Sequence, residues 1–390
     1  MMILDKPYVS KFLEDFLLDM QIPVLKNKAL EELNISSKIL AIDEKEFIKR
    51  VKLSQIPQIF SNSENSINWI NQNLGFTDLP KKISIFKDKY EFRKIMKPYY
   101  PNYFFQKVKF SELEKIDVSK LQFPFIIKPA IGFFSLGVYL VNNLEEWPNI
   151  IKFIQRDMDN INEIFPIEVI DSSSFIIEEN IEGEEYAVDV YFNSHGKPVI
   201  LNILKHYFAS PEDTSDRLYI TSKKIIEQSR EIFLETLEKI SQATNIKNFP
   251  MHIEFRVDEN KKIGIIEANP MRFAGLCVTD LAYYAWGSNN YKLYFEQKAP
   301  DWNQILKGKE GKIYAMVVGN IPADIKLRDI KSVDYNLFEK KFSKPLDIRK
   351  INFHEFPLFA IAFVEFNAMN MEEMVKLLKE DFRDVLHLKY

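Results

Sequence analysis

Two neighbouring stretches of this 390-residue chain carry two glutamates, Glu254 and Glu267, and an asparagine, Asn269, whose side chains could act together. The stretches, residues 251–257 and 263–269, alternate between apolar and polar residues as half-buried strands do. The polar segment between them predicts a turn, and a turn centred there places Glu254 opposite Glu267. Asn269 follows Glu267 by two positions and is therefore expected on the same face.

This hairpin indicates a divalent cation site. Two unpaired carboxylates about 5 Å apart repel by roughly 3 kcal/mol at an effective dielectric constant of about 20. Mg²⁺ or Mn²⁺ would offset that repulsion and leave positions free for phosphate oxygens. The alternative is a solvated polar face on which His252 and Arg256 neutralise the acids. The opposite face is expected to be apolar, with Met251, Ile253, Phe255 and Val257 against Gly264, Ile266 and Ala268.

A second segment combines an apolar strand, a lysine and two glycines within residues 123–138. Lys128 ends the strand, where its ammonium group is costly to desolvate unless it meets an anion. A loop with Gly132 and Gly137 can turn backbone N–H groups toward a phosphate. The alternative is a simple hairpin whose lysine reaches solvent.

A third segment, residues 174–192, is an apolar strand that ends in Glu178 and Glu179, bends at Gly183 and leaves as another alternating strand. The bend leaves the backbone groups of residues 179 and 181 outside the strand ladder, so they could bind an adenine edge. Glu185 could accept hydrogen bonds from ribose hydroxyls. An ordinary hairpin with acidic turn residues is the alternative.

In this order the segments resemble the ATP-grasp superfamily over roughly residues 85–290. The residues that carry the resemblance are Asp88, Lys89, Lys128, Gly132, Ser135, Gly137, Glu178, Glu179, Asn180, Ile181, Gly183, Glu185, Glu254, Glu267 and Asn269. The resemblance implies that Lys89 and Lys128 contact ATP phosphates, and that residues 130–137, with Gly132, Ser135 and Gly137, fold over them.

The same resemblance implies the rest of an ATP site. Glu178, Glu179 and Ile181 would hold adenine, the latter two through backbone groups, and Glu185 would hold ribose. The metal ligands would be Glu254, Glu267 and Asn269, binding one or two Mg²⁺ or Mn²⁺ ions. Arg272 would steady the transferred phosphoryl group or the carboxylate substrate, and Lys205 or His206 would reach the γ-phosphate.

Two features depart from the family pattern. Phe133 and Phe134 stand in the glycine loop where many relatives have small residues. The family often shows Asn-Pro-Arg, whereas here Met271 intervenes between Asn269-Pro and Arg272, which puts the role of Arg272 in question. Residues 273–277 either present backbone N–H groups to an oxyanion or begin a buried helix. Cys277 is expected to be packed rather than nucleophilic, because no histidine lies at a partnering position.

The order of strand and helix patterns predicts a mixed α/β (α+β) protein with the ATP-grasp fold, in which two α+β subdomains grip ATP. We expect an N-terminal α/β domain at 1–83, an ATP-grasp domain at 84–309 with its lid at about 104–180, and a C-terminal α+β block at 310–390. The last helix is expected over residues 372–386. The C-terminal block either closes the site or forms the surface of a homodimer.

Composition limits the partners. A net charge of −4 and a pI near 5.9 give no reason to expect nucleic-acid binding. The single cysteine excludes an internal disulfide framework. The N-terminus lacks the pattern of a signal peptide, and the longest apolar run, residues 356–364, is too short to span a bilayer. These features predict a cytoplasmic protein without a membrane partner.

The expected function is an ATP-dependent ligase that activates a carboxylic acid, with an amino acid among the candidates, and joins it to an amine. The acid would become an acylphosphate, and ADP and phosphate would leave. Alternatives on the same scaffold are a phosphotransferase, a carboxylating enzyme and a non-catalytic ATP-binding protein. Arg272 with an acidic neighbour such as Asp280 would suit a zwitterionic amino acid, although Asp280 is more simply explained as a residue that starts or caps a helix.

Overall fold

The computed structural model describes residues 1–33, 35–132, 137–162, 171–210 and 215–389. Ser135 and the phenylalanines at 133 and 134 lie outside the described residues. The helices are α1 (Lys11–Met20), α2 (Lys28–Glu32), α3 (Glu44–Leu53), α4 (Ile67–Asn73), α5 (Leu79–Lys87), α6 (Lys89–Met96), α7 (Trp147–Asn162), α8 (Lys223–Thr244), α9 (Leu281–Trp286), α10 (Asn290–Phe295), α11 (Trp302–Ile305), α12 (Tyr335–Glu339) and α13 (Met371–Lys379).

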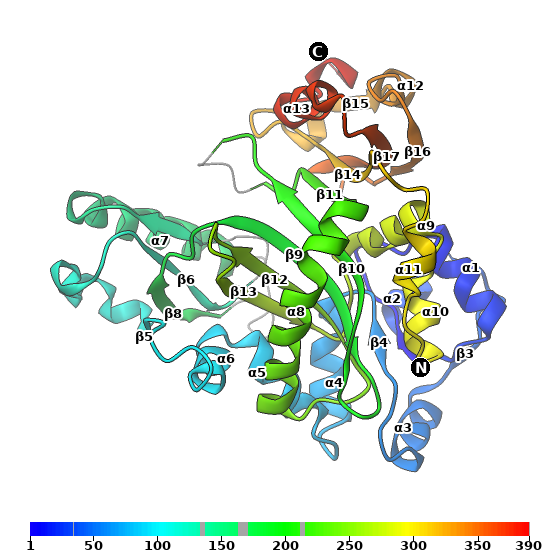
Figure 1. Cartoon of the computed structure of the whole chain (residues 1–390), viewed down its shortest axis with the longest axis horizontal. Coiled ribbons are helices and arrows are strands. Elements are labelled where there is room, and N and C mark those ends of the chain that lie inside the picture. The colour runs from blue at the N-terminus through cyan, green and yellow to red at the C-terminus, as the bar shows by residue number, and fades with distance from the viewer. Residues whose placement is uncertain (34, 133–136, 163–170, 211–214, 390) are drawn as a thin grey trace.

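A long antiparallel sheet forms the body of the molecule (Figure 1). Within the described ranges it has eight strands in the order β13-β12-β9-β10-β11-β14-β17-β16. α8 covers one face, where Phe233 packs against Tyr186 and Phe255. These strands are β9 (Glu184–Phe192), β10 (Pro198–Tyr207), β11 (Leu218–Ser222), β12 (Phe249–Val257), β13 (Ile263–Pro270), β14 (Lys312–Asn320), β16 (Pro345–Lys350) and β17 (Leu358–Asn367).

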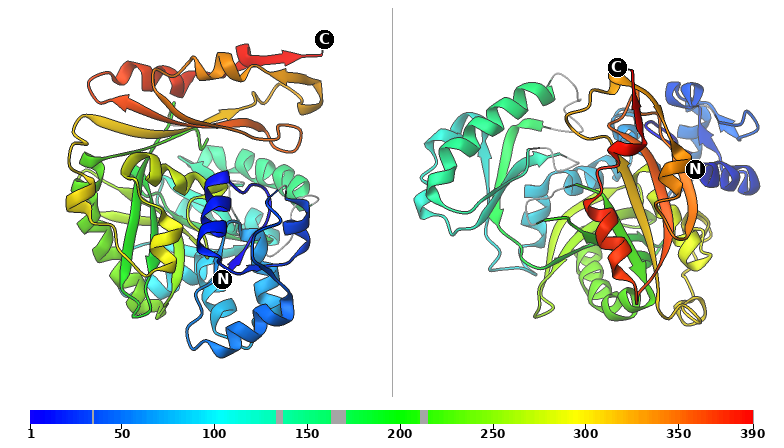
Figure 2. Two further views of the ribbon diagram at one scale, coloured as in Figure 1. Left: turned by 90° about the vertical axis from the view of Figure 1, so that its right-hand side faces the viewer. Right: turned by 90° about the horizontal axis from the view of Figure 1, so that it is seen from above.

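Two smaller sheets lie beside the body (Figure 2). The lid sheet has the order β5-β8-β6-β7 and its own apolar core with α7. The N-terminal sheet is parallel, with the order β3-β2-β1-β4. Their strands are β1 (Met2–Ile3), β2 (Val24–Leu25), β3 (Ala41–Ile42), β4 (Phe60–Ser61), β5 (Phe105–Lys109), β6 (Phe125–Ile131), β7 (Tyr139–Val141) and β8 (Asp171–Glu179).

The C-terminal region is not built as a separate layer. β14, β16 and β17 extend the body sheet, and only the pair β15 (Ile330–Val333) and β18 (Leu386–Leu388) lies apart from it in the described chain. The expected last helix over 372–386 was too long. α13 ends at Lys379, and the chain continues as η7 (Arg383–Val385) and β18, because Phe382 adopts a left-handed conformation with φ 57° and is fully buried.

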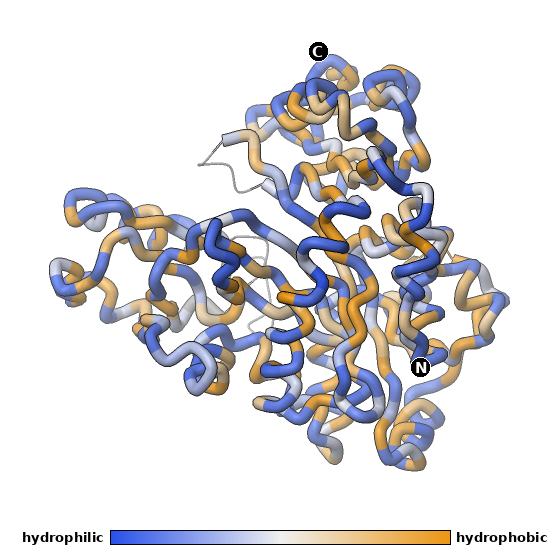
Figure 3. Tube along the Cα trace, in the orientation of Figure 1, coloured by the Kyte–Doolittle hydropathy of each residue, from blue (hydrophilic) through white to orange (hydrophobic). Residues whose placement is uncertain are grey.

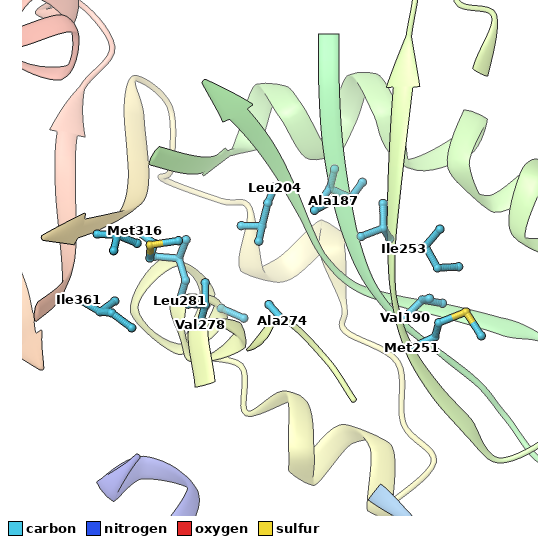
Figure 4. Packing of buried hydrophobic residues seen from close by; sticks show 14 of the residues in the cluster. Ala187, Val190, Leu204, Met251, Ile253, Ala274, Val278, Leu281, Met316 and Ile361 are labelled. Carbon is cyan, nitrogen blue, oxygen red and sulfur yellow. The ribbon is translucent and has the colours of Figure 1, made fainter. Parts of the chain in front are cut away.

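The main core runs through the body sheet and the segment after β13. Figure 3 shows apolar residues along the strands in the middle of the molecule. Figure 4 shows part of this cluster, in which Ala187 and Ile253 come from neighbouring strands and Val278 and Leu281 from the segment that follows β13. The apolar faces of the strands therefore fix the side on which their polar residues emerge.

The predicted hairpin register is confirmed at the acidic end, where Glu254 pairs with Glu267 and His252 with Asn269. It is wrong beyond that point, because a bulge shifts the ladder and Phe255 pairs with Ile265 rather than with Ile266. Ile265 is consequently the residue that is buried in the core. Ile266 is the extra residue of the bulge, and its carbonyl accepts a hydrogen bond from outside the hairpin.

The bend between lid and body depends on Gly183, which has φ +110°. A Cβ added there would lie 2.2 Å from the carbonyl oxygen of Val257. We therefore expect Gly183→Ala to lower the free energy of unfolding by about 3 kcal/mol or more, measured by denaturant titration. Gly287→Ala is the matched control, because φ is +70° there but nothing lies within 4 Å; it should cost only about 1–2 kcal/mol. Equal losses would contradict the steric argument.

Candidate active site

One face of the body sheet carries the predicted metal ligands. Glu254 and Glu267 face each other across β12 and β13, and Asn269 donates a hydrogen bond from Nδ2 to Glu267 Oε1 at 3.2 Å. His252 lies on the same face, with Nε2 3.9 Å from Glu254 Oε1. Its Nδ1 is 2.8 Å from Asp189 Oδ1. Strand alternation places these side chains together, as the sequence predicted.

The two glutamates differ in their electrostatic surroundings. Burial raises the pKa of the Glu254 carboxyl well above its ordinary value, and the neighbouring carboxylates, Glu267 foremost, raise it further. Burial by itself would also raise the pKa of Glu267, but three lysines led by Lys89 lower it to about 2. Lys89 Nζ lies 3.0 Å from Glu267 Oε2. Glu254 has no lysine or arginine within salt-bridge distance in the described part of the chain.

This donor set fits Mg²⁺ or Mn²⁺. Two carboxylates and an amide are hard oxygen ligands, and no lysine or arginine among the described residues lies within salt-bridge distance of Glu254. The described residues contain no group of three or more His, Cys, Asp or Glu side chains arranged to hold a metal ion. The fit therefore depends on the amide of Asn269 and on oxygens that a nucleotide would supply.

The N-terminus of α6 positions Lys89. Asp88 caps the helix by accepting hydrogen bonds from the backbone N–H groups of Tyr90 and Glu91, and it also pairs with Lys107 at 2.9 Å. Lys89 then reaches both Glu267 and the carbonyl oxygen of Gly132, the latter at 3.2 Å. Lys89 thus joins the start of the glycine loop to the hairpin of β12 and β13. We call this hairpin the metal hairpin, because it carries the predicted metal ligands.

Lys128 and Glu178 face each other within the lid sheet. Lys128 Nζ lies 2.6 Å from Glu178 Oε1, and both side chains are buried. Sequence reasoning missed the third partner, Arg93 of α6, whose Nε lies 2.8 Å from Glu178 Oε2. Its spacing was a usable signal, since Arg93 follows Lys89 by four residues and lies one turn along the same helix face.

The hinge segment, residues 180–183, joins β8 to β9. The carbonyl of Glu179, expected to face adenine, accepts a hydrogen bond from the Tyr103 hydroxyl at 3.3 Å. The carbonyl of Ile181 lies 3.4 Å from Arg256 Nη1. A cavity of about 430 Å³ borders the hinge segment and is lined by α6, the loop after it and β13. Its described lining does not include the acids of the metal hairpin.

Glu185 lies on the face of the body sheet that also carries Glu254, which we call the cleft face, and it has two basic neighbours. His206 Nδ1 is 2.9 Å from its Oε1, and Arg256 Nη2 is 3.1 Å from its Oε2. Lys205 projects from the opposite face of β10, 2.5 Å from Glu184, because adjacent strand residues point to opposite sides. Of the two residues expected near the γ-phosphate, only His206 therefore shares the face of Glu185.

Arg272 lies just after the end of β13. Met271, the extra residue in the Asn-Pro-Met-Arg run, adopts φ 69°, a left-handed conformation that turns the chain after β13. Arg272 Nη2 then lies 3.0 Å from Glu64 Oε1, and Lys87 pairs with the same carboxylate. Glu64 and Lys87 had no recognisable motif in the sequence. Their arrangement depends on the packing of the N-terminal domain against β13.

Of the two interpretations of Asp280, the structure agrees with the helix start, because Asp280 is the residue from which α9 begins. Its carboxylate makes no capping hydrogen bond to that helix, and it pairs with Arg349 rather than with Arg272. Asp280 Oδ2 accepts from Ser10 Oγ at 2.6 Å and pairs with Arg349 Nη2 at 3.0 Å, which ties the N-terminal and C-terminal regions together. Cys277 is buried as predicted, and burial raises the pKa of its thiol to about 11, far from a reactive thiolate.

Residues 121–280, which include most of this cleft, match the ATP-grasp domain family. This segment of the chain is an ATP-grasp domain. The resemblance found in the sequence and the predicted mixed α/β fold are thereby confirmed. The match coincides with the lid, the hinge segment and the metal hairpin.

Individual relatives of this chain are distant. The alanine–anticapsin ligase of Bacillus amyloliquefaciens is 24% identical over 164 residues, a match that covers 39% of this chain and 34% of that ligase. The chain thus spans about a third of this relative. The crystal structure of an L-amino acid ligase from Bacillus licheniformis superposes with a TM-score of 0.65 at 15% identity, over 100% of this chain and 98% of the ligase.

A third similar structure carries the nucleotide. The biotin carboxylase domain of 2-oxoglutarate carboxylase from Hydrogenobacter thermophilus, crystallised with MgADP, ADP and bicarbonate, has a TM-score of 0.62 at 12% identity, covering 100% of this chain and 90% of that domain. At these identities the likeness shows the fold. The predicted cofactors, ATP with Mg²⁺, are those of the superfamily. No helix in the described ranges has the length and apolar character needed to cross a membrane.

The opposite pKa shifts of the two hairpin glutamates predict opposite effects of their removal. Glu254→Gln should stabilise the metal-free protein by about 1 kcal/mol near pH 7, because the ionised Glu254 opposes folding above its ordinary pKa of 4.5. Glu267→Gln should destabilise it by about 1–3 kcal/mol, because Lys89 loses its partner. This loss should vanish as the pH falls from 4.5 toward 2.

Denaturant titration without divalent cations measures both effects. Glu238→Gln is the control, since this glutamate is exposed on α8. Shifts of the same sign for the two hairpin variants would contradict the assignment of charge in the cleft.

Proposed function

We propose that the protein is an ATP-dependent ligase that converts a carboxylic acid into an acylphosphate and joins it to an amine, releasing ADP and phosphate. One arrangement supports this proposal. Lys89 pairs with Glu267, whose strand partner is Glu254. Lys128 pairs with Glu178, and Arg272 pairs with Glu64. These groups would suit phosphates at the lysines, a metal ion at the paired glutamates and a substrate carboxylate at Arg272.

We infer that Glu254, Glu267 and Asn269 hold Mg²⁺ or Mn²⁺. When bound, the ion neutralises charge on the phosphate oxygens that are transferred. Glu254, which has no lysine or arginine within salt-bridge distance among the described residues, is the ligand with most to gain from such an ion. Lys89 would pass from Glu267 to a phosphate when the ion arrives.

The chain's own groups then bind and orient the reactants. Lys89 and Lys128 would fix the phosphates, Glu185 would hold ribose, and Glu178 with the backbone of residues 179 and 181 would hold adenine. Arg272 would hold the carboxylate so that its oxygen attacks the γ-phosphorus and the bond to ADP breaks. The amine would attack the acyl carbon and expel phosphate. His206 would lie near the phosphates, because it is on the cleft face with Glu185, whereas Lys205 points to the opposite face.

An α-amino acid is the substrate class that fits best. Two basic groups, Arg272 and Lys87, surround the single carboxylate of Glu64, so this end of the cleft carries a net positive charge that suits a substrate carboxylate. Two of the relatives above are named as ligases of alanine or L-amino acids.

The first test is ADP release from ATP with a panel of carboxylic acids, with hydroxylamine as a trap for acylphosphates. A ligase should give ADP, free phosphate and a hydroxamate, all dependent on the acid. A phosphotransferase would give a phosphorylated product without free phosphate, and a carboxylating enzyme would require bicarbonate. A binding protein would give none of these products. Any of those outcomes would overturn the proposal.

Glu267→Gln should reduce ADP formation by about 10²–10³-fold or more while the fold is retained, because a charged group is lost from the site of phosphoryl transfer. Circular dichroism checks the fold, and the control is Glu238→Gln. Turnover near that of the wild type would refute the metal assignment.

Arg272→Gln should raise the KM for the carboxylic acid by about 10-fold or more and change the KM for ATP little, because the lost group binds the acid. Glu64 would then keep only Lys87 as a partner, so the double variant Arg272→Gln with Glu64→Gln serves as the charge-matched control. A rise in both KM values to the same extent would argue against a carboxylate site at Arg272.

A further inference from the structure

Arg93 is anchored at three points in the joint between lid and body. Its Nε and Nη2 lie 2.8 and 3.3 Å from the two carboxylate oxygens of Glu178, and Nη2 also donates to the carbonyl of Ile266 at 3.0 Å. The guanidinium lies over the ring of Tyr103, 5.3 Å from its centroid. Only 5% of the side chain is exposed. A planar fork satisfies all these partners at once, which a lysine cannot do.

Glu178 has a second cation, because Lys128 Nζ lies 2.6 Å from its Oε1. All three side chains are buried. Burial alone would raise the pKa of the Glu178 carboxyl, but Arg93 and Lys128 lower it to about 2, so it is a carboxylate at neutral pH. The cluster holds two positive charges and one negative charge.

The two cations differ in their freedom to leave. Lys128 has one ionic partner among the described residues and a flexible stem, whereas Arg93 is also tied to Ile266 and Tyr103. If Glu178 had only Lys128, the departure of the lysine would leave a buried carboxylate without a counter-ion, which is strongly unfavourable. Because Arg93 also pairs with Glu178, the carboxylate keeps a counter-ion when Lys128 leaves.

We propose that Arg93 is a positioning residue that remains paired with Glu178 and thereby frees Lys128 to exchange this carboxylate for a nucleotide phosphate. The inference rests on the proposed nucleotide site. Arg93 would act through Glu178 and Lys128 and not through a contact of its own with the phosphates. It also holds the bulge of β13 at Ile266, next to the metal ligand Glu267, so the same side chain aligns the lid strand with the metal hairpin.

The test is calorimetric binding of the Mg²⁺ complex of a non-hydrolysable ATP analogue. Arg93→Met should weaken binding by about 10-fold or more, because Lys128 becomes the sole partner of Glu178 and is held there. Arg93→Lys should weaken it less. The double variant Arg93→Met with Glu178→Gln should bind within about 3-fold of Glu178→Gln alone, because no carboxylate then retains Lys128.

Two comparisons separate this role from a purely structural one. The double variant contains no carboxylate that depends on Arg93, and its one unpaired buried charge in this cluster, Lys128, is unpaired in Glu178→Gln as well. Arg349→Met, which removes a buried arginine paired with Asp280 and Asp347, should lower stability and leave nucleotide affinity unchanged. The proposal is overturned if Arg93→Met binds the analogue like the wild type, or if the double variant stays about 10-fold weaker than Glu178→Gln. A wild-type protein that binds no nucleotide would instead overturn the proposed function.

Discussion

Buried carboxylates on the cleft face need cations, and that requirement connects the separate parts of this protein. Glu178 from the lid and Glu267 from the body both depend on basic residues of α6. Glu64 from the N-terminal domain depends on Lys87 and on Arg272. Because an unpaired charge in such a setting is costly, each ion pair fixes how one element lies against another. The cleft is therefore held together by the groups that are proposed to bind its substrates.

One carboxylate of the cleft face has no such ion pair with a lysine or arginine among the described residues. Glu254 lies among other acids and has no close lysine or arginine among the described residues. Glu64, Glu178, Glu185 and Glu267 each have a lysine or arginine within salt-bridge distance. A divalent cation would therefore balance the most charge beside Glu254, where the metal is proposed.

Much of the fold followed from local patterns. The strand that ends near Lys128, the two strands on either side of Gly183 and the pairing of Glu254 with Glu267 were readable because alternation and turn residues act over a few positions. The bulge at Ile266 was not readable, since it depends on an arginine from another element that binds the freed carbonyl. The end of α13 at Lys379 likewise depends on the burial of Phe382 by distant residues.

The sequence by itself determined the chemistry available: a paired-acid hairpin, a lysine before a glycine loop and an acidic hinge, in the order of an ATP-grasp domain. Tertiary structure alone decided the partners of those groups. It placed Lys205 away from the cleft, gave Asp280 to Arg349, and brought Glu64 to Arg272 across more than half of the chain. The physical reason is the distance along the chain over which each effect acts. Periodicity fixes which face a side chain takes, whereas the counter-ion it meets depends on which distant element the core packs beside it.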